Sequence, residues 1–249
     1  MRTTFCSSDL VRLLGAWVPA PPDDAALDFA ERLSLKLGPL EAIALQAVNQ
    51  QGRARPAVAR KAPATLAARL REDVERVRQA LAHAIAQEPE PFFEVPLPGG
   101  KTRAAPPSPA DAIGAGYQRR HLALQRQMEQ MVAAVRDHVR QTVAGASPRL
   151  QQLAAIDATL EKVLAAREQA ALPKIHRLLE RRFKLLRQEN ERACADQADG
   201  EDDPARWQQP GGWLHAFAAE WRQVLLAERD LRLHPVTGLV EAVAEETNE

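Results

Sequence analysis

The sequence is poor in the residues that build strands. Aromatic residues account for 4% of its 249 residues, with a single tyrosine, and threonine and isoleucine are also scarce. Because β-branched and aromatic side chains are the ones that fit a pleated sheet, this composition argues against a strand-rich fold. The apolar fraction of 45%, mostly alanine and leucine, still suffices for the core of one large or two small soluble domains.

Cysteines and long apolar runs are also lacking. The two cysteines, Cys6 and Cys194, lie far apart, and neither belongs to a CxxC pair, which argues against a disulfide framework or a zinc knuckle. Asp9 and Arg12 interrupt the first apolar run, as a signal peptide would not tolerate. No stretch approaches the roughly 18 uncharged apolar residues of a membrane-spanning helix. We therefore predict reduced thiols and a cytoplasmic location.

The formal net charge is zero, but the charges are unevenly distributed. Residues 101–192 hold 17 basic and 9 acidic residues, whereas residues 193–249 hold 4 basic and 12 acidic ones. A basic middle can attract an anionic partner such as a nucleic acid. Because the excess in the middle equals the deficit in the tail, we favour mutual neutralisation of the two regions within the folded chain.

Amphipathic helical patterns separated by proline and glycine breaks fill most of the chain. Apolar residues recur at spacings of three and four over 8–18, 23–37, 40–50, 65–86, 110–144, 148–172, 173–192 and 211–232. His234 and Pro235 are expected to break the last helix, with one or two further turns over 236–243. In 40–50, the apolar side of the helix comprises Leu40, Ile43, Ala44, Ala47 and Val48. We predict an all-α protein, a bundle of about seven helices.

The longest pattern predicts the spine of that bundle. Ser147 and Pro148 are typical of a helix start, so the helix that follows residue 144 runs antiparallel to the one before it. Pro173 either kinks this second helix or starts another. The first helix carries a heptad seam, with spacings of four and three, at Tyr117, His121, Leu124, Met128, Met131, Val135, His138 and Thr142.

These patterns divide the chain into five regions, which we expect to form one domain. Phe92 and Phe93 are expected to dock on a neighbouring surface, because they are too apolar for a free loop. The regions are an N-terminal helical region (1–86), a proline-rich loop (87–109), the long helical hairpin (110–192), an acidic polar linker (193–209) and a C-terminal helix packing on the bundle (210–249).

The stretch WLHAFAAEW, residues 213–221, is the most concentrated group of functional side-chain types. His215 and Glu220 are five residues apart, which separates their directions on a helix by about 140°, so they cannot share a metal ion. Trp213, Phe217 and Trp221 instead form one stripe at a spacing of four. We interpret this stripe as the packing anchor of the C-terminal helix, with a surface for a partner as the alternative.

A second candidate surface lies in RLLERRFKLLRQENER, residues 177–192. Phe183 could stack on a base, but it continues an apolar stripe with Leu179 and Leu186, so we favour its burial. His121 and His138 lie too far apart on one helix to form a site, and each histidine of the chain is interpreted as satisfied or partly exposed. The candidate anion or nucleic-acid face comprises Arg177, Arg181, Arg182, Lys184 and Arg187.

Motifs of catalysis are missing. The sequence has no HExxH, no phosphate-binding glycine loop and no GxSxG, so we predict no catalytic residue, no metal and no cofactor. The chain is expected to be a helical interaction or accessory protein that binds another protein, and not an enzyme. The alternative is a nucleic-acid-binding regulator that uses the basic hairpin. Whether the heptad seam pairs within one chain or between copies in a homo-oligomer stays open.

Three stretches resemble a bacterial family known only as an all-helical domain of unknown function. They are LVRLLGAWVPAPPDDAALDFAERLSLKLGPLEAIALQAV, the central YQRRHLALQRQME with SPRLQQLAAIDATLEKVLAAREQAALPKIHRLLERRFKLLR, and GWLHAFAAEWRQVLLAERDLRLHPVTGLVEA. The resemblance implies no activity and no functional residue. We associate such genes with neighbours that encode membrane proteins with peptidoglycan-binding or proton-motor-like parts, which would make this chain a cytoplasmic partner of a membrane-associated complex.

Overall fold

The protein is described from a computed structural model, which covers residues 8–18, 38–53, 64–91, 108–196 and 202–248. All regular structure in these ranges is helical, so the prediction of an all-α bundle is confirmed. The segments 23–37 and 92–107, with Phe92 and Phe93, lie outside the described residues. The helices are α1 (Asp9–Gly15), α3 (Pro39–Arg53), α4 (Ala64–Ala86), α5 (Pro109–Ala144), α6 (Pro148–Ala171), α7 (Pro173–Ala195), the single turn α8 (Pro204–Trp207) and α9 (Trp213–Asn248).

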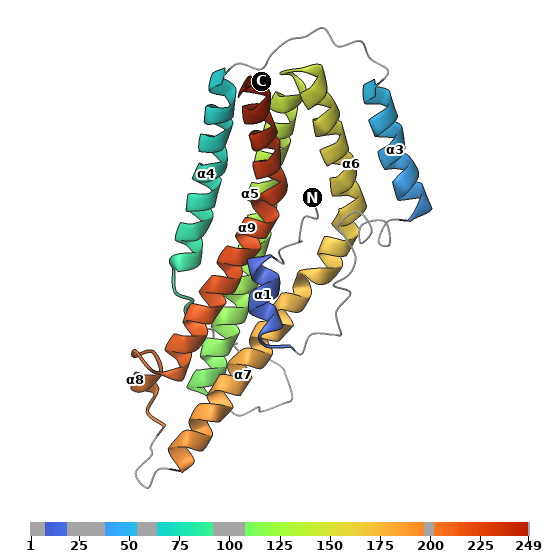
Figure 1. The fold of residues 1–249 in the computed structure, drawn as a ribbon. Helices are drawn as coiled ribbons and strands as arrows, with labels where there is room; N and C mark the ends of the chain where they lie inside the picture. Colours follow the sequence, from blue (N-terminus) through green and yellow to red (C-terminus); the bar gives the residue numbers. More distant parts are fainter. Residues whose placement is uncertain (1–7, 19–37, 54–63, 92–107, 197–201, 249) are drawn as a thin grey trace, which may run out of the picture.

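Four long legs form an elongated antiparallel bundle, shown in Figure 1. The legs are α4, α5, the pair α6 and α7 in succession, and α9; α5 and α9 run in one direction, and α4 and the α6–α7 pair run in the opposite direction. α3 lies along α6, and α1 packs across α9 near the middle of the molecule. The predicted hairpin is therefore present as α5 and α6, and the C-terminal helix packs against both α4 and α5.

The starts of the helices follow from their first residues. Ser108 accepts from the backbone N–H of Asp111, whose carboxylate accepts from the Ser108 backbone, so α5 begins with a capping box. Ser147 caps α6, with Pro148 in the first turn as the sequence indicates. Pro173 starts α7 directly after Leu172, which settles the two alternatives in favour of a new helix.

The expected break at His234 and Pro235 is wrong, because α9 continues through Pro235 to Asn248. Proline within a helix removes one backbone hydrogen bond and costs about 3 kcal/mol. The helix tolerates this cost because the residues on both sides of the proline are buried, each side chain contributing about 1.5–3 kcal/mol. These buried residues are Leu233, Val236, Leu239, Val240 and Val243.

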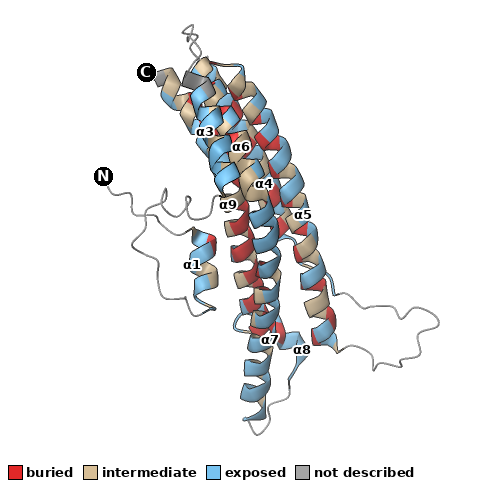
Figure 2. Ribbon diagram, turned by 90° about the vertical axis from the view of Figure 1, so that its right-hand side faces the viewer, coloured by how far each residue is buried: buried red, intermediate tan, exposed pale blue. Residues whose placement is uncertain are grey.

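The core runs along the inner faces of the legs, shown in red in Figure 2. The heptad seam of α5 is buried from Tyr117 to Met128 and again at Val135, whereas Met131 is half-buried and His138 is exposed. Beyond Met128 the buried face consists of Val132, Val135, Val139 and Val143. An α-helix with 3.6 residues per turn drifts away from a repeat of 3.5, and this drift carries His138 out of the core.

α3 differs from its predicted orientation. Leu40 and Ile43, which the sequence places on its apolar side, are 82% and 60% exposed. The half-buried residues between 39 and 50 are Glu41, Leu45 and Val48, of which Val48 belongs to the predicted side, and the helix packs on α6. The pattern of a short helix does not distinguish two adjacent faces when apolar residues occur on both.

The acidic region 193–209 contains a docked element. α7 extends into it as far as Ala195, and the single turn α8 places Trp207 in the core with only 7% of its surface exposed. The Trp207 indole Nε1 donates to the Asp202 carboxylate at 2.6 Å. None of the helices in the described ranges is long and apolar enough to cross a membrane.

Candidate functional site

A pocket between α5 and α7, with α9 as its floor, is the candidate site, and we call it the α5–α7 pocket. Its cavity volume is about 230 Å³. One side is contributed by the first turns of α5, the other by the middle of α7. Its lining comprises Asp111, Gly114, Ala115, Tyr117, Gln118, His121, His176, Leu179, Glu180, Phe183, Lys184, Arg187, Phe217 and Trp221.

The floor of the pocket is a lattice of aromatic rings. Phe183 meets Phe217 edge to face with centroids 5.0 Å apart, and Tyr117 meets Trp221 at 5.2 Å and 85°. Edge-to-face pairs hold rings in defined orientations. Trp213 lies behind the floor, 5.1 Å from Phe183. The structure thus places the whole aromatic stripe of WLHAFAAEW in the interior, with two of its members facing the pocket.

Small residues on α5 make room for this arrangement. A Cβ on Gly114 would lie 3.0 Å from the ring of Phe183, and a Cβ on Gly116 would lie 2.2 Å from the carbonyl oxygen of Glu90. Both distances are shorter than ordinary van der Waals contact. The short GAG stretch therefore serves packing: it lets Phe183 and the backbone after α4 approach α5.

Two histidines from different helices meet at one end of the pocket. The rings of His121 on α5 and His176 on α7 have centroids 6.2 Å apart and are tilted by 30°. The Gln118 amide lies within hydrogen-bond distance of His176 Nε2, at 3.3 Å. His121 is 1% exposed, and neither of its ring nitrogens has a partner among the described residues. This contradicts the interpretation of His121 as a satisfied or partly exposed histidine.

Protonation of the pocket is governed by burial. Burial, together with the smaller effects of His176 and Arg232, lowers the pKa of His121 to about 4. Burial also raises the pKa of Tyr117 to about 12. Both side chains are therefore neutral near pH 7, so the pocket offers an imidazole and a phenol without charge.

The low pKa of His121 predicts acid sensitivity. The unfolded chain takes up this proton near pH 6.5 and the folded chain only near pH 4, so stability is retained above 6.5 and lost as pH falls towards 4. The loss from this residue is about 3 kcal/mol. Urea unfolding across this range should show a shallower pH dependence for His121→Leu than for the wild type. His215→Leu, at an exposed position, is the control, and coincident profiles for all three proteins would refute the assignment.

Two residues of the predicted anion face, Lys184 and Arg187, line the pocket, and most of the cations of this face are engaged. Arg182 binds the Glu220 carboxylate with two hydrogen bonds of 2.7 and 2.6 Å, and Lys184 binds Glu180 at 2.6 Å. Arg187 binds both Asp111 and Glu191. Arg177 and Arg181 are exposed, and Phe183 is buried. The nucleic-acid alternative therefore gains no support from this face, since carboxylates neutralise three of its cations and its aromatic ring is not available for stacking.

A buried acid lies next to the pocket, at the break between α6 and α7. Glu228 on α9 is fully buried and accepts from Gln125 of α5 and from Arg232 one turn further along α9. Gln125 also donates to the carbonyl of Leu172 at the helix break, at 3.4 Å. The carboxylate is thus satisfied within the chain.

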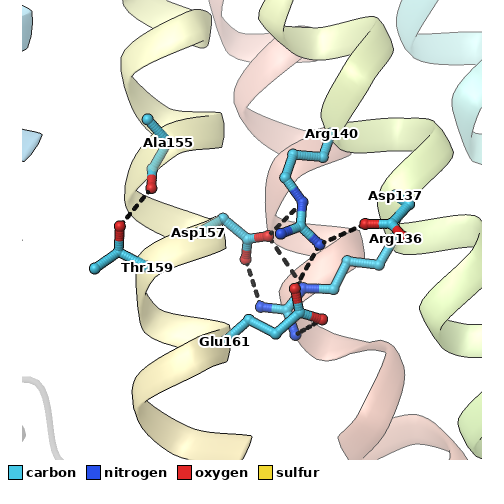
Figure 3. A network of polar contacts seen from close by, with 7 residues as sticks. All are labelled: Arg136, Asp137, Arg140, Ala155, Asp157, Thr159 and Glu161. Atoms are coloured by element: carbon cyan, nitrogen blue, oxygen red, sulfur yellow. Dashed lines mark hydrogen bonds and ion pairs between the residues drawn. The ribbon is translucent and has the colours of Figure 1, made fainter.

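A second buried network lies further along α5, shown in Figure 3. Arg136 donates to both oxygens of Asp157 on α6, at 3.0 and 2.7 Å, and both side chains are buried. Arg140 joins through Glu161 at 2.7 Å. Every charge in this network faces an opposite charge, so it serves to join the two helices of the hairpin.

A shallower depression lies on the surface between α4 and α5, and we call it the α4–α5 groove. It has a volume of about 520 Å³. Its apolar floor includes Val77, Met131 and Val135, and His138 at its edge lies 3.4 Å from the Asp73 carboxylate. The groove thus contains two seam residues, Met131 and His138, that the described part of the chain leaves incompletely buried beside the buried Val135.

The sequence predicted part of the arrangement of these side chains. Glu220 binds Arg182 and His215 is exposed, so the two are not brought together as a site. Sequence reasoning missed the meeting of His121 with His176, which lie on different helices. The available signal was a histidine between the apolar residues of the first half of the seam. Within the described ranges, no group of three or more His, Cys, Asp and Glu residues is arranged to hold a metal ion.

Comparison with known proteins gave one match. A family model described as "Protein of unknown function (DUF3348)" matches residues 1–245. No curated protein and no solved structure matches the chain. The function therefore has to be inferred from the chemistry of the surfaces described above.

Proposed function

The chain belongs to this family of proteins of unknown function, and we propose that it is a non-enzymatic helical interaction protein that receives a helix of a partner protein in the α4–α5 groove. The observation that carries this proposal is the part of the heptad seam that the described helices leave incompletely covered. Met131 and His138 sit at seam positions, yet Met131 is only half-buried and His138 is 58% exposed at its side chain. Heptad positions that no helix of the same chain covers are suited to a helix from another chain.

The shape of the groove favours a helix over an extended peptide. Met131, Ala134 and His138 present side chains at spacings of three and four along one ridge, with Val77 opposite on α4. Ridges of this spacing pack into the grooves of another helix. Methionine, with its flexible side chain, adapts readily to a partner surface. The rim carries both an acid and a base, Asp73 and Arg76, so the partner helix is expected to be apolar on one face and of mixed charge at its edges.

The absence of enzymatic activity is part of the proposal. Its support is that the buried charges of the described core neutralise one another, as in Arg136 with Asp157 and Arg232 with Glu228. Catalytic groups usually face an open pocket with a partner that orients them. The exception is His121, which has no such partner.

A charge placed in the groove tests the proposal. Ala134 replaced by a photo-crosslinking amino acid is expected to form an adduct with a partner in cells, and the further change Met131→Glu is expected to abolish that adduct. Leu185→Glu is the matched control, because Leu185 is also an apolar surface residue but lies on α7. Loss of the adduct in both variants, or in neither, would contradict docking in the groove.

The same variants distinguish a partner from a second copy of the chain. Light scattering of the pure protein is expected to show a monomer. A dimer that Met131→Glu dissociates would overturn the proposal of a foreign helix and assign the groove to self-association. A finer proposal, a cytoplasmic partner of a membrane-associated complex, rests on the resemblance of the sequence, and its test is whether the adduct sediments with membranes.

A further inference from the structure

The α5–α7 pocket is separate from the α4–α5 groove and has a composition of its own. It combines aromatic walls with one buried polar side chain, His121, whose two ring nitrogens have no partner in the described chain. A buried polar group without a hydrogen bond loses its interactions with water and gains nothing in return. A ligand that hydrogen-bonds to His121 would remove this cost.

The size of the pocket limits the ligand to a small molecule. An engineered apolar cavity of about 150 Å³ in another protein accommodates benzene. The volume of about 230 Å³ therefore suits one ring, or an aliphatic body of similar size, with a short chain. It is too small for a nucleotide or a flavin, because pockets for drug-sized ligands start at about 300 Å³.

The charged groups near His121 determine which charge the polar group of the ligand can carry. His176 and Arg232 are the charged or titratable groups that act on it most strongly, and both are basic. The acids of this region are already engaged: Glu228 by Gln125 and Arg232, Glu180 by Lys184, and Asp111 by Arg187. Because Arg232 is itself paired with Glu228, an anion near His121 is met chiefly by the unpartnered imidazole, which offers an N–H donor, whereas an ammonium group would find no free carboxylate in the pocket lining.

We propose that the α5–α7 pocket binds a small organic carboxylate. The apolar body of the ligand lies on the aromatic rings of Phe183, Phe217 and Trp221. Its carboxylate accepts a hydrogen bond from the N–H of His121, with His176 beside it. The site is independent of the proposed function, since it uses α7 and α9 in place of α4.

Three matched probes test the chemistry on the full chain. They are 3-phenylpropionate, 3-phenylpropanol and 3-phenylpropylamine, which share one apolar body and differ in the polar end. Titration calorimetry, with the fluorescence of the tryptophans as a second readout, is expected to give the acid at least about tenfold higher affinity than the alcohol, because hydrogen bonds to charged groups are the stronger ones. The amine is expected to bind more weakly than the alcohol.

Two variants assign the binding to this pocket. His121→Leu removes the donor and keeps the apolar walls, so the acid is expected to lose its advantage while the alcohol still binds. Ala115→Trp fills the pocket from α5 and should abolish binding of all three probes, with circular dichroism showing that the helices remain. Equal affinities of acid and amine, an acid preference that survives His121→Leu, or no binding of any probe in the millimolar range would each overturn the proposal. None of these results bears on the crosslink in the α4–α5 groove.

Discussion

Replacement of Trp221 by alanine is expected to lower the free energy of unfolding by about 3–5 kcal/mol. Trp221 is 1% exposed and packs edge to face against Tyr117 at 5.2 Å, at the point where α5 and α9 meet. Its indole N–H has no partner among the described residues, so the substitution leaves no acceptor unsatisfied. The loss is therefore one of packing alone: the transfer of the ring to water, and the cavity that the surrounding helices cannot fill.

Thermal and urea unfolding would measure this effect. For a chain of this size, each kcal/mol lowers the melting temperature by about 2–4 °C, so a fall of roughly 6–20 °C is expected. Leu185→Ala is the control, because Leu185 is 44% exposed and its loss should change stability by no more than about 0.5 kcal/mol. Equal melting temperatures for the wild type and Trp221→Ala would mean that the indole ring does not contribute to the packing of the core. The aromatic stripe of residues 213–221 would then face a partner instead.

The stripe shows what the sequence was able to predict. Within one helix, spacing fixes direction, so the grouping of Trp213, Phe217 and Trp221 and the separation of His215 from Glu220 both follow from 3.6 residues per turn. Helix starts were predictable for the same local reason, since Ser147 and Pro148 act on their own helix. These inferences need no knowledge of which helix lies opposite.

The errors arise where a neighbouring helix decides the outcome. Pro235 reads as a break, but the burial of Val236 and Leu239 against other legs holds α9 together. His138 reads as a seam position, but the drift of a straight helix turns it to solvent. The local sequence pattern shows that a proline or a histidine is unfavourable at its position. Whether contacts with other helices offset this cost depends on the tertiary packing, which the pattern does not show.

The α5–α7 pocket could not be predicted from the sequence, because it depends on the relative positions of several helices. His121 and His176 lie on helices whose relative position depends on the break at Leu172 and Pro173. A change of one residue in the length of α6 would rotate α7 by about 100° and move His176 away from the pocket. The aromatic floor was predictable as a stripe, whereas the polar end depends on how three helices meet.

Replacement of Asp157 by alanine is expected to cost about 3–5 kcal/mol, because it leaves a buried guanidinium without its partner. Burial alone lowers the pKa of Arg136, and the hydrogen bonds and charge of Asp157, with Glu161, more than reverse this, so that its pKa lies above the ordinary value. Arg136 stays charged at any ordinary pH, so removal of Asp157 leaves that charge buried without its main partner. Glu161, at 3.4 Å from Arg136, compensates in part.

A matched control lies on the same network. Asp137 also binds an arginine, Arg140, at 3.1 Å, but its side chain is 66% exposed. Asp137→Ala is therefore expected to cost less than about 1 kcal/mol in urea unfolding, since water replaces the lost interaction. A similar loss for the two alanine variants would show that burial does not govern the strength of this network.

The double variant Arg136→Met with Asp157→Leu tests whether the ion pair contributes to the stability of the fold or mainly to the register of the two helices. Removing both charges leaves neither one unpaired, so most of the loss seen in Asp157→Ala is expected to be recovered. If the double variant unfolds as early as the single one, the network contributes packing that aliphatic side chains cannot supply. We expect stability to be recovered, which would mean that the pair serves mainly to fix the register of α5 against α6. In that case the double variant should show broader amide resonances than the wild type along this hairpin.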